Sequence, residues 1–178
     1  MESRQVTDTS LLLRRIRMSD IRLSPETALP LIIESIKQNG SCRVVVTGNS
    51  MFPFLHHKED TVILSELTDP PKKGDILFYT RPSGQCVLHR VMKADGDPII
   101  FCGDAHYLTE PVRREKLVAK AIAVDRGKKV VSFDSFRWRF ISRLWIGTLP
   151  IRPFLMRIIY HFTPSGRKLL KPSKDGEN

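Results

Sequence analysis

Between residues 42 and 133 the chain is a succession of short runs rich in β-branched residues, separated by clusters of turn-forming residues. The runs are CRVVVT, DTVILSE, DILFYT, CVLHRVM, PIIFC, LVAKAIAVD and KVVSF, and the separating clusters include PPKKGD, RPSGQ, ADGD and DRGK. Short strands at close, turn-punctuated intervals are typical of an all-β sandwich or small barrel. Helical periodicity is absent here apart from one turn near 113–117. We therefore predict a mainly β fold.

Helices are predicted on both sides of this β region. The segment SPETALPLIIESIKQNG has a helix start at Ser24, a proline at the first helical position and a stop at Gly40, which predicts a helix over 25–39. The later segment mixes aromatic residues with arginines and predicts two short amphipathic helices broken near Pro150. The predicted organisation is a flexible arm (1–23), a domain with its leading helix (24–133), a basic and aromatic helical extension (134–162) and a disordered tail (163–178).

The charge of the chain is uneven. The formal net charge is +10, and most of the excess lies in residues 134–178, whereas 56–110 is close to balanced. Such an excess suggests an anionic partner, which is nucleic acid, anionic lipid or an acidic peptide. The length of 178 residues suits one domain with appended segments.

Cysteine usage and the apolar runs limit the chemistry and the compartment. Cys42, Cys86 and Cys102 are widely spaced and form no CxxC pair, so we expect buried free thiols, no metal site and no cofactor. The first residues contain only three consecutive leucines, too few for a secretory signal. No run approaches the ~18 apolar residues of a spanning helix. We expect a cytoplasmic protein.

Ser50 stands in the stretch TGNSMFPFL, just after an apolar run and the turn pair Gly48-Asn49. The residues that follow, Met51 to Pro53, form an apolar shelf beside it. This places the hydroxyl at the rim of the sheet, a suitable position for a nucleophile. Serine needs a neighbouring base to act as one at neutral pH.

The base is sought among five histidines. His89 stands inside a predicted strand, where alternation puts it on the same face as Val87 and Val91. Asp104 follows a glycine at a strand end, where a carboxylate can reach a ring nitrogen. The remaining histidines are expected on the surface, in a polar loop or in the tail: His56, His57, His106 and His161.

Four motifs of this sequence, in their order along the chain, resemble those of a known family. The order G-x-S-M-x-P, GDILFY, LHRV and GDA, over roughly 41–127, resembles the signal peptidase and LexA-type serine peptidase superfamily. The histidine of LHRV is similar to that of the endoplasmic-reticulum and archaeal branch, where bacterial enzymes place a lysine. The helix before VVVTGNSMFPFL resembles small soluble bacterial members without an anchor. The resemblance implies Ser50 as nucleophile, His89 as general base and Asp104 as the acid that orients the imidazole. Glu110 corresponds more loosely to a second acid of the reticulum branch.

The sequence also departs from the family. Some bacterial members have a serine hydroxyl two residues before the nucleophile, where this chain has Gly48. A backbone amide near Ser50, helped by the Asn49 side chain, would then hold the oxyanion. We expect Asn49, Met51 and Pro53 to contact substrate.

The predicted function is a serine endopeptidase of signal-peptidase type that cleaves a precursor or leader peptide. One alternative is a catalytically silent module of the same fold that adds an extended peptide to a sheet edge. The other is a self-cleaving regulator of the LexA kind. That kind uses a serine–lysine pair and a DNA-binding helix-turn-helix, but residues 1–40 offer one clear helix, so we expect no nucleic-acid partner.

The helical extension has two interpretations. Its apolar residues could cover one flank of the sheet domain while its arginines face solvent. Alternatively, residues 136–162 could lie on an anionic membrane surface, which would make the protein peripheral at the inner membrane face.

Overall fold

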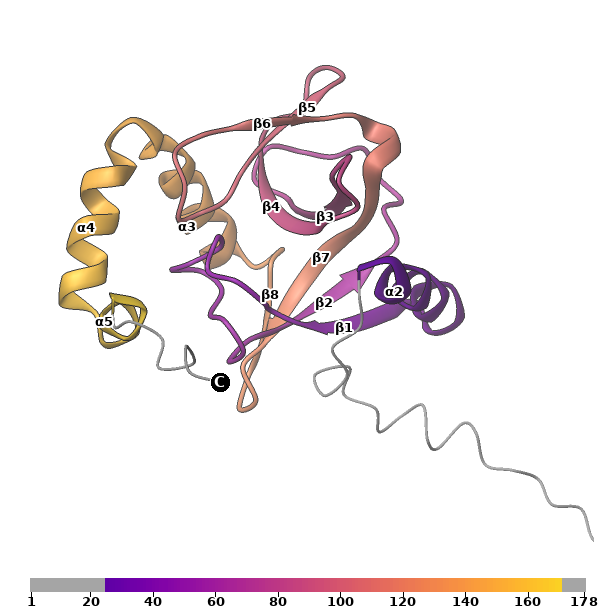
Figure 1. Ribbon diagram of the computed structural model, residues 1–178, viewed down its shortest axis with the longest axis horizontal. Coiled ribbons are helices and arrows are strands. Elements are labelled where there is room, and N and C mark those ends of the chain that lie inside the picture. The colour runs from indigo at the N-terminus through magenta and orange to yellow at the C-terminus, as the bar shows by residue number, and fades with distance from the viewer. Residues whose placement is uncertain (1–24, 171–178) are drawn as a thin grey trace, which may run out of the picture.

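One antiparallel sheet organises the fold. The structure is a computed structural model and describes residues 25–170. Within them the strands run in the order β1-β2-β7-β3-β4-β5-β6, with β8 paired to β7 (Figure 1). This confirms the predicted mainly β fold. The strands are β1 (Ser41–Val45), β2 (Thr61–Ser65), β3 (Ile76–Thr80), β4 (Cys86–Lys93), β5 (Ile99–Cys102), β6 (Glu110–Val112), β7 (Leu117–Asp125) and β8 (Val130–Ser132).

Strand β3 separates two hydrophobic clusters. Its Ile76 and Phe78 pack into a cluster with residues of β1, β2, β7 and the N-terminal helix. Leu77 and Tyr79, on the other face, pack into a second cluster with residues of β4, β5 and β6. Apolar residues on both faces explain the continuous run ILFY, because a strand buried on both sides does not alternate with polar residues.

The N-terminal helix forms as predicted. Helix α2 spans Pro25–Asn39, and its Ile32 and Ile36 are buried in the first cluster. Gly40 ends the helix with φ +73°, and its N–H donates to the Ile36 carbonyl at 2.8 Å. A left-handed glycine of this kind is a frequent helix stop. The predicted start at Ser24 and the predicted arm over 1–23 lie outside the described residues.

The C-terminal helices lie on the side of the sheet away from α2 (Figure 1). Helix α3 (Phe136–Gly147), a 3₁₀ turn η2 (Leu149–Ile151) and α4 (Arg152–Phe162) confirm the two predicted helices broken near Pro150. Within residues 25–170, none of the helices combines the length and the apolarity needed to cross a bilayer.

The predicted disordered tail is wrong at its beginning, because α5 (Pro164–Leu170) is a helix. Thr163 caps it: its hydroxyl oxygen accepts the Gly166 N–H at 2.9 Å, and Pro164 occupies the first helical position. This start signal was present in the sequence. Residues 171–178 lie outside the described part of the chain.

Two short elements precede β7. Strand β6 was not predicted, and it contains Pro111 and pairs only with β5. A proline is tolerated there because an edge strand can lack one ladder hydrogen bond. The 3₁₀ turn η1 (Arg114–Lys116) follows it and confirms the predicted turn near 113–117.

Candidate active site

A cleft opens beside the end of β1, the turn that follows it and strand β4. Its walls combine apolar side chains of β1, β3 and β4 with a group of polar residues that includes Ser50, His89 and His106. The structure therefore brings the predicted nucleophile and the predicted base to the same cleft. The apolar lining is Val44, Val45, Val46, Met51, Val62, Phe78, Val87 and Leu88.

The turn that carries Ser50 is held by backbone hydrogen bonds. Gly48 has φ +93°, a conformation that favours glycine, and its N–H donates to His57 Nδ1 at 2.8 Å. The Ser50 carbonyl accepts the Ala105 N–H at 2.9 Å, which ties the turn to the loop after β5. His57 thus stabilises the turn and is half-buried, as is His56, whereas we had expected both on the surface.

The backbone carbonyl of Ser50 and the two imidazoles of His89 and His106 lie close together around Gly103. A side chain beginning at Gly103 would lie 2.7 Å from the Ser50 carbonyl oxygen, 3.0 Å from His106 Nδ1 and 3.1 Å from His89 Nε2. Glycine is therefore required for these groups to approach one another. His106 was predicted only as a residue of a polar loop, yet its ring lies 6.0 Å from that of His89.

The hydrogen bonds of His89 determine which nitrogen is available as a base. Its Nδ1 lies 2.9 Å from Glu110 Oε1 and 3.1 Å from the Tyr79 hydroxyl, and the Tyr79 hydroxyl itself donates to Glu110 Oε1 at 2.5 Å. A nitrogen held against a carboxylate carries the proton. Within residues 25–170, Nε2 has no hydrogen-bond partner, so Ser50 and His89 are neighbours that are not hydrogen-bonded. Nε2 is the free acceptor, on the side of Gly103 and Ser50.

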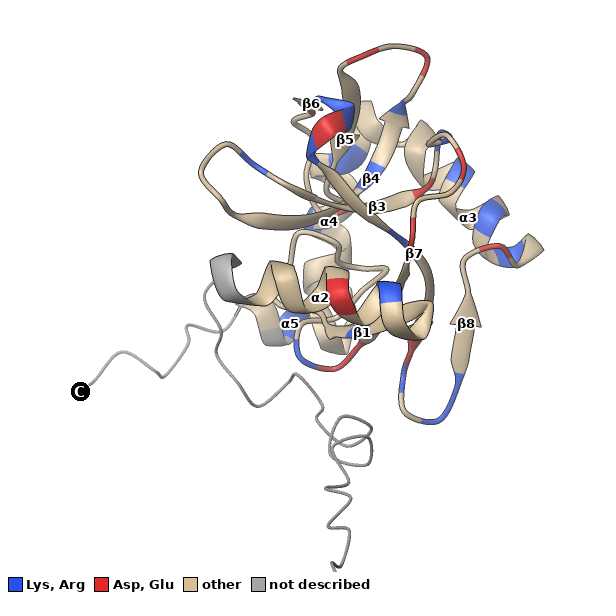
Figure 2. Cartoon of the chain, turned by 90° about the vertical axis from the view of Figure 1, so that its right-hand side faces the viewer, with Lys and Arg blue, Asp and Glu red and all other residues tan. Residues whose placement is uncertain are grey.

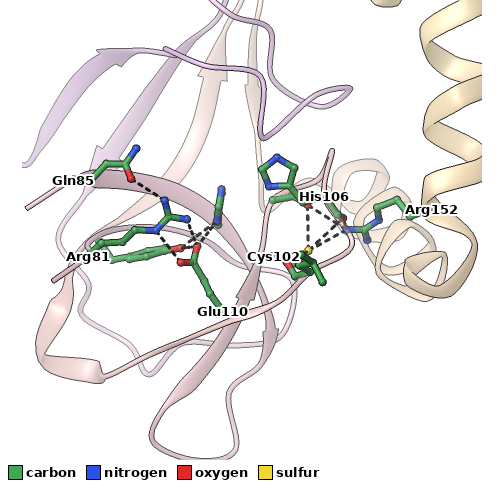
Figure 3. A network of polar contacts seen from close by, with 10 residues as sticks. Arg81, Gln85, Cys102, His106, Glu110 and Arg152 are labelled. Carbon is green, nitrogen blue, oxygen red and sulfur yellow. Dashed lines mark hydrogen bonds and ion pairs between the residues drawn. The ribbon is translucent and has the colours of Figure 1, made fainter. Parts of the chain in front are cut away.

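Glu110 is kept ionised by Arg81. The guanidinium donates to both carboxylate oxygens, at 2.8 and 2.7 Å, and also to Gln85 at 2.8 Å (Figure 3). Burial by itself would raise the pKa of Glu110, but the hydrogen bonds from Arg81 and Tyr79 outweigh it and lower that pKa to about 2. A full negative charge therefore faces His89 at neutral pH.

The pKa of His89 is lowered from its ordinary value of 6.5. Burial is the main cause, because it disfavours the charged imidazolium. The carboxylate of Glu110 opposes this effect without cancelling it. His89 is therefore neutral at pH 7 and able to accept a proton, while Glu110 is placed to stabilise the cation once it forms.

Asp104 requires a correction. We expected it to orient His89, but its two carboxylate oxygens accept hydrogen bonds from Arg90 at 2.8 and 2.7 Å, and both side chains are fully buried. The reason lies in the strand register. Arg90 pairs with Cys102 across β4 and β5, so the chain just after Cys102 lies beside Arg90. Because successive side chains alternate, Arg90 and His89 point to opposite faces of β4.

The acid that contacts His89 comes instead from β6. Glu110 had been noted as a looser correspondence, whereas Tyr79 and Arg81 were not predicted. The signal for these two was the alternation in and after β3, which places Leu77, Tyr79 and Arg81 on one side, and Leu77 pairs with His89. Nothing in the local sequence indicated that β6 would bring Glu110 to the same point.

The expected substrate contacts divide into two groups. Asn49 is exposed and Met51 is buried, and both line the cleft. Pro53 is half-buried and does not belong to the described residues that line it.

Comparisons with known proteins add no family assignment. Neither models of protein families nor curated protein sequences gave a match to this chain. The chemistry of the cleft is therefore the basis for assigning a function. Cys42 and Cys102 are buried free thiols and Cys86 is half-buried. Over residues 25–170, no group of three or more His, Cys, Asp and Glu residues is placed to hold a metal ion.

Proposed function

We propose that the chain is a serine endopeptidase of signal-peptidase type, with Ser50 as nucleophile and His89 as general base. Glu110 takes the orienting position that the sequence had suggested for Asp104. One observation carries this proposal: Ser50 and His89 line one cleft, the Ser50 backbone lies beside the His89 ring around Gly103, and Nε2 is free while Nδ1 is held by an ionised carboxylate. A serine, an imidazole and a carboxylate in these roles form the arrangement that acyl transfer needs.

The reaction follows from these contacts. Ser50 Oγ attacks the carbonyl carbon of the scissile bond while its proton passes to His89 Nε2, and the Glu110 carboxylate stabilises the imidazolium. The imidazolium then protonates the departing amine, the C–N bond breaks and an acyl-enzyme ester remains. A water molecule attacks that ester with His89 again accepting the proton, which releases the carboxylic acid product and restores Ser50. In this mechanism the hydrogen bond between the Ser50 hydroxyl and His89 Nε2 forms when substrate binds, because catalytic hydrogen bonds are often long in the absence of substrate.

The reaction also requires hydrogen-bond donors that stabilise the oxyanion of the tetrahedral intermediate. The Ser50 N–H donates to no acceptor within residues 25–170. We propose that this amide binds the developing oxyanion, with the exposed Asn49 side chain as a second donor at the cleft. Gly48 leaves the position two residues earlier without a side chain, so no hydroxyl competes for this role.

The walls of the cleft indicate the substrate class. Strand β1 pairs with β2 alone among the described strands, so its other edge is open beside the cleft. An extended peptide can add to this edge through its backbone, as peptides do at other sheet edges. Val44, Val87 and Leu88 make the adjoining wall apolar. We propose that the substrate is a precursor or leader peptide with an apolar side chain next to the cleaved bond.

A fluorophosphonate probe tests the proposal directly, because it labels a serine only when a base activates it. Wild-type protein should be labelled and Ser50→Ala should not, whereas Ser83→Ala, at an exposed turn, is the matched control and should be labelled like wild type. Both variants should unfold at nearly the wild-type temperature, since Ser50 is only half-buried and Ser83 is exposed. Labelling that persists in Ser50→Ala would remove Ser50 from the mechanism.

One observation favours a second candidate. Because Ser50 and His89 are not hydrogen-bonded in this structure, the same cleft could hold an extended peptide without cleaving it. A wild-type protein that binds peptides but takes up no probe would support this silent module.

A further inference from the structure

The C-terminal helices expose large apolar side chains along one face each. On α3 these residues follow helical spacing from Phe136, which is 83% exposed, and on η2 and α4 they do so up to Phe162, which is 80% exposed. Residues three or four positions apart share one face of a helix. The stripes are Phe136, Phe140, Ile141 and Leu144 on α3, and Ile151, Phe154, Ile158 and Phe162 on η2 and α4.

The opposite faces of both helices are fixed to the rest of the protein. Trp138 of α3 stacks on Phe133, with ring centroids 4.4 Å apart. Tyr160 of α4 stacks on Phe52, with centroids 5.5 Å apart. The helices therefore cover a flank of the sheet domain, as one of the two interpretations expected. Because the helices pack through these opposite faces, the apolar stripes remain exposed to solvent.

The charges around the stripes have one sign. Residues 135–170 contain no Asp or Glu, while α3 contains several basic residues (Figure 2). Five exposed arginines belong to α3, α4 and α5, and within the described part of the chain none of them forms an ion pair. They are Arg137, Arg139, Arg143, Arg157 and Arg167.

We propose that α3 and α4 dock on the surface of an anionic lipid bilayer. The apolar stripes enter the headgroup boundary, and the arginines meet lipid phosphates. Exposed apolar stripes with basic flanks have the composition of interfacial helices, and the break at Pro150 allows the two helices to lie in the plane of the membrane. The proposal does not depend on the chemistry of Ser50.

Charge complementarity decides among the occupants of this surface. A second copy would bring arginines against arginines, and like charges across an interface oppose association. Residues 1–24 hold five arginines against three acids, a net charge of +2, so this segment is also repelled. An anionic bilayer supplies both the negative charge and the apolar phase.

Docking would hold the cleft near the membrane. Trp145 Nε1 donates to the Asp104 carbonyl at 3.1 Å. Arg152 donates to the His106 carbonyl at 2.9 Å (Figure 3). These contacts link the helices to the loop that carries His106 at the cleft. An enzyme positioned in this way would act on peptides at or near the lipid surface.

The test is co-sedimentation of full-length Ser50→Ala protein with phosphatidylcholine vesicles, with and without about 30% phosphatidylglycerol. Because Ser50→Ala protein lacks the proposed nucleophile, the result of this test does not depend on whether the proposed peptidase is active. Binding should occur on the anionic vesicles and fall steeply between ~0.05 and ~0.5 M NaCl, because salt screens the arginines. Equal binding to both vesicle types, or none to either, would overturn the proposal.

Variants locate the contact. Phe136→Ser/Phe154→Ser should lose most binding, and Arg137→Gln/Arg143→Gln should lose roughly fivefold for each arginine removed. Leu31→Ser and Arg113→Gln change exposed residues on other elements and should bind like the parent.

Two results would assign the surface to another occupant. If Arg14→Gln/Arg15→Gln abolishes vesicle binding while the helix variants retain it, residues 1–24 make the lipid contact. If the protein is a dimer that Phe136→Ser/Phe154→Ser dissociates, and the parent does not bind anionic vesicles, a second copy covers the stripes. Either result would overturn the proposal.

Discussion

The clearest test of the site compares Glu110→Gln with Asp104→Asn. Glutamine keeps the size of Glu110 and one acceptor oxygen, but removes the negative charge 2.9 Å from His89 Nδ1. In the proposed mechanism, that charge stabilises the imidazolium formed in the transition state. Hydrogen bonds to charged groups contribute about 1.5–3 kcal/mol, so kcat/KM should fall roughly 10- to 150-fold.

The pH profile should change as well. In wild type, kcat/KM should rise with pH through the pKa of His89, which lies below 6.5, because the imidazole must be neutral to accept the serine proton. The Glu110 carboxylate raises this pKa and Arg81 lowers it. Replacing the carboxylate therefore leaves only effects that lower the pKa of His89, namely burial and the interactions with His106 and Arg81, and the rise should move to lower pH. A purely structural defect would lower the plateau without moving the midpoint.

Asp104→Asn is the matched control for charge. It leaves the guanidinium of Arg90 buried without its anionic partner, which costs about 3–5 kcal/mol in folding free energy. Thermal unfolding should occur well below the wild-type temperature, by roughly 6–20 °C for a chain of this size. The folded fraction should keep the wild-type pH midpoint, since Arg90 and Asp104 lie on the other face of β4.

The measurement is kcat/KM for a cleaved peptide, or the rate of probe labelling, from about pH 4.5 to 8, with folding monitored by circular dichroism at each pH. A midpoint that shifts in Asp104→Asn and stays constant in Glu110→Gln would refute the assignment of Glu110 to the imidazole.

Three further predictions concern the same groups. His89→Asn should lower the rate of probe labelling by on the order of 10²-fold or more, and an active variant would exclude His89 as the base. Gly103→Ala should lose probe labelling and about 1–3 kcal/mol of stability in urea unfolding. The reason is that the alanine methyl would lie 2.7 Å from the Ser50 carbonyl oxygen, which belongs to the backbone and has little freedom to move. Labelling and stability like those of wild type would refute the close approach. Because the pKa of Glu110 is lowered to about 2 in the folded state, its contribution to the free energy of unfolding is present above about pH 4.5 and is lost as pH falls toward 2. Solvent screening limits this contribution to ~1–2 kcal/mol. Glu110→Gln should therefore remove the corresponding loss of stability between about pH 4.5 and 2.

Local patterns in the sequence were sufficient for the elements. Short β-branched runs between turn clusters predicted the strands β1 to β5, β7 and β8, because a side-chain period of two and the turn residues are properties of the chain itself. The stop at Gly40 and the break near Pro150 were predicted for the same reason, since both depend on the backbone freedom of single residues. The same alternation put His89 on the face of β4 that the structure turns toward Tyr79.

Only the tertiary structure decided which acid contacts His89. The sequence favoured Asp104 because it follows a strand end closely, but pairing of Arg90 with Cys102 carries Asp104 to the other face of β4. Glu110 reaches the imidazole because it lies on β6, an edge strand of three residues. Such a strand is too short to show a periodic pattern of apolar residues in the sequence. Strand pairing joins residues far apart in the chain, and its register depends on the packing of the whole sheet. For this reason the motifs around Ser50 and His89 were sufficient to propose these two residues, whereas the carboxylate that contacts His89 depended on the pairing of β6.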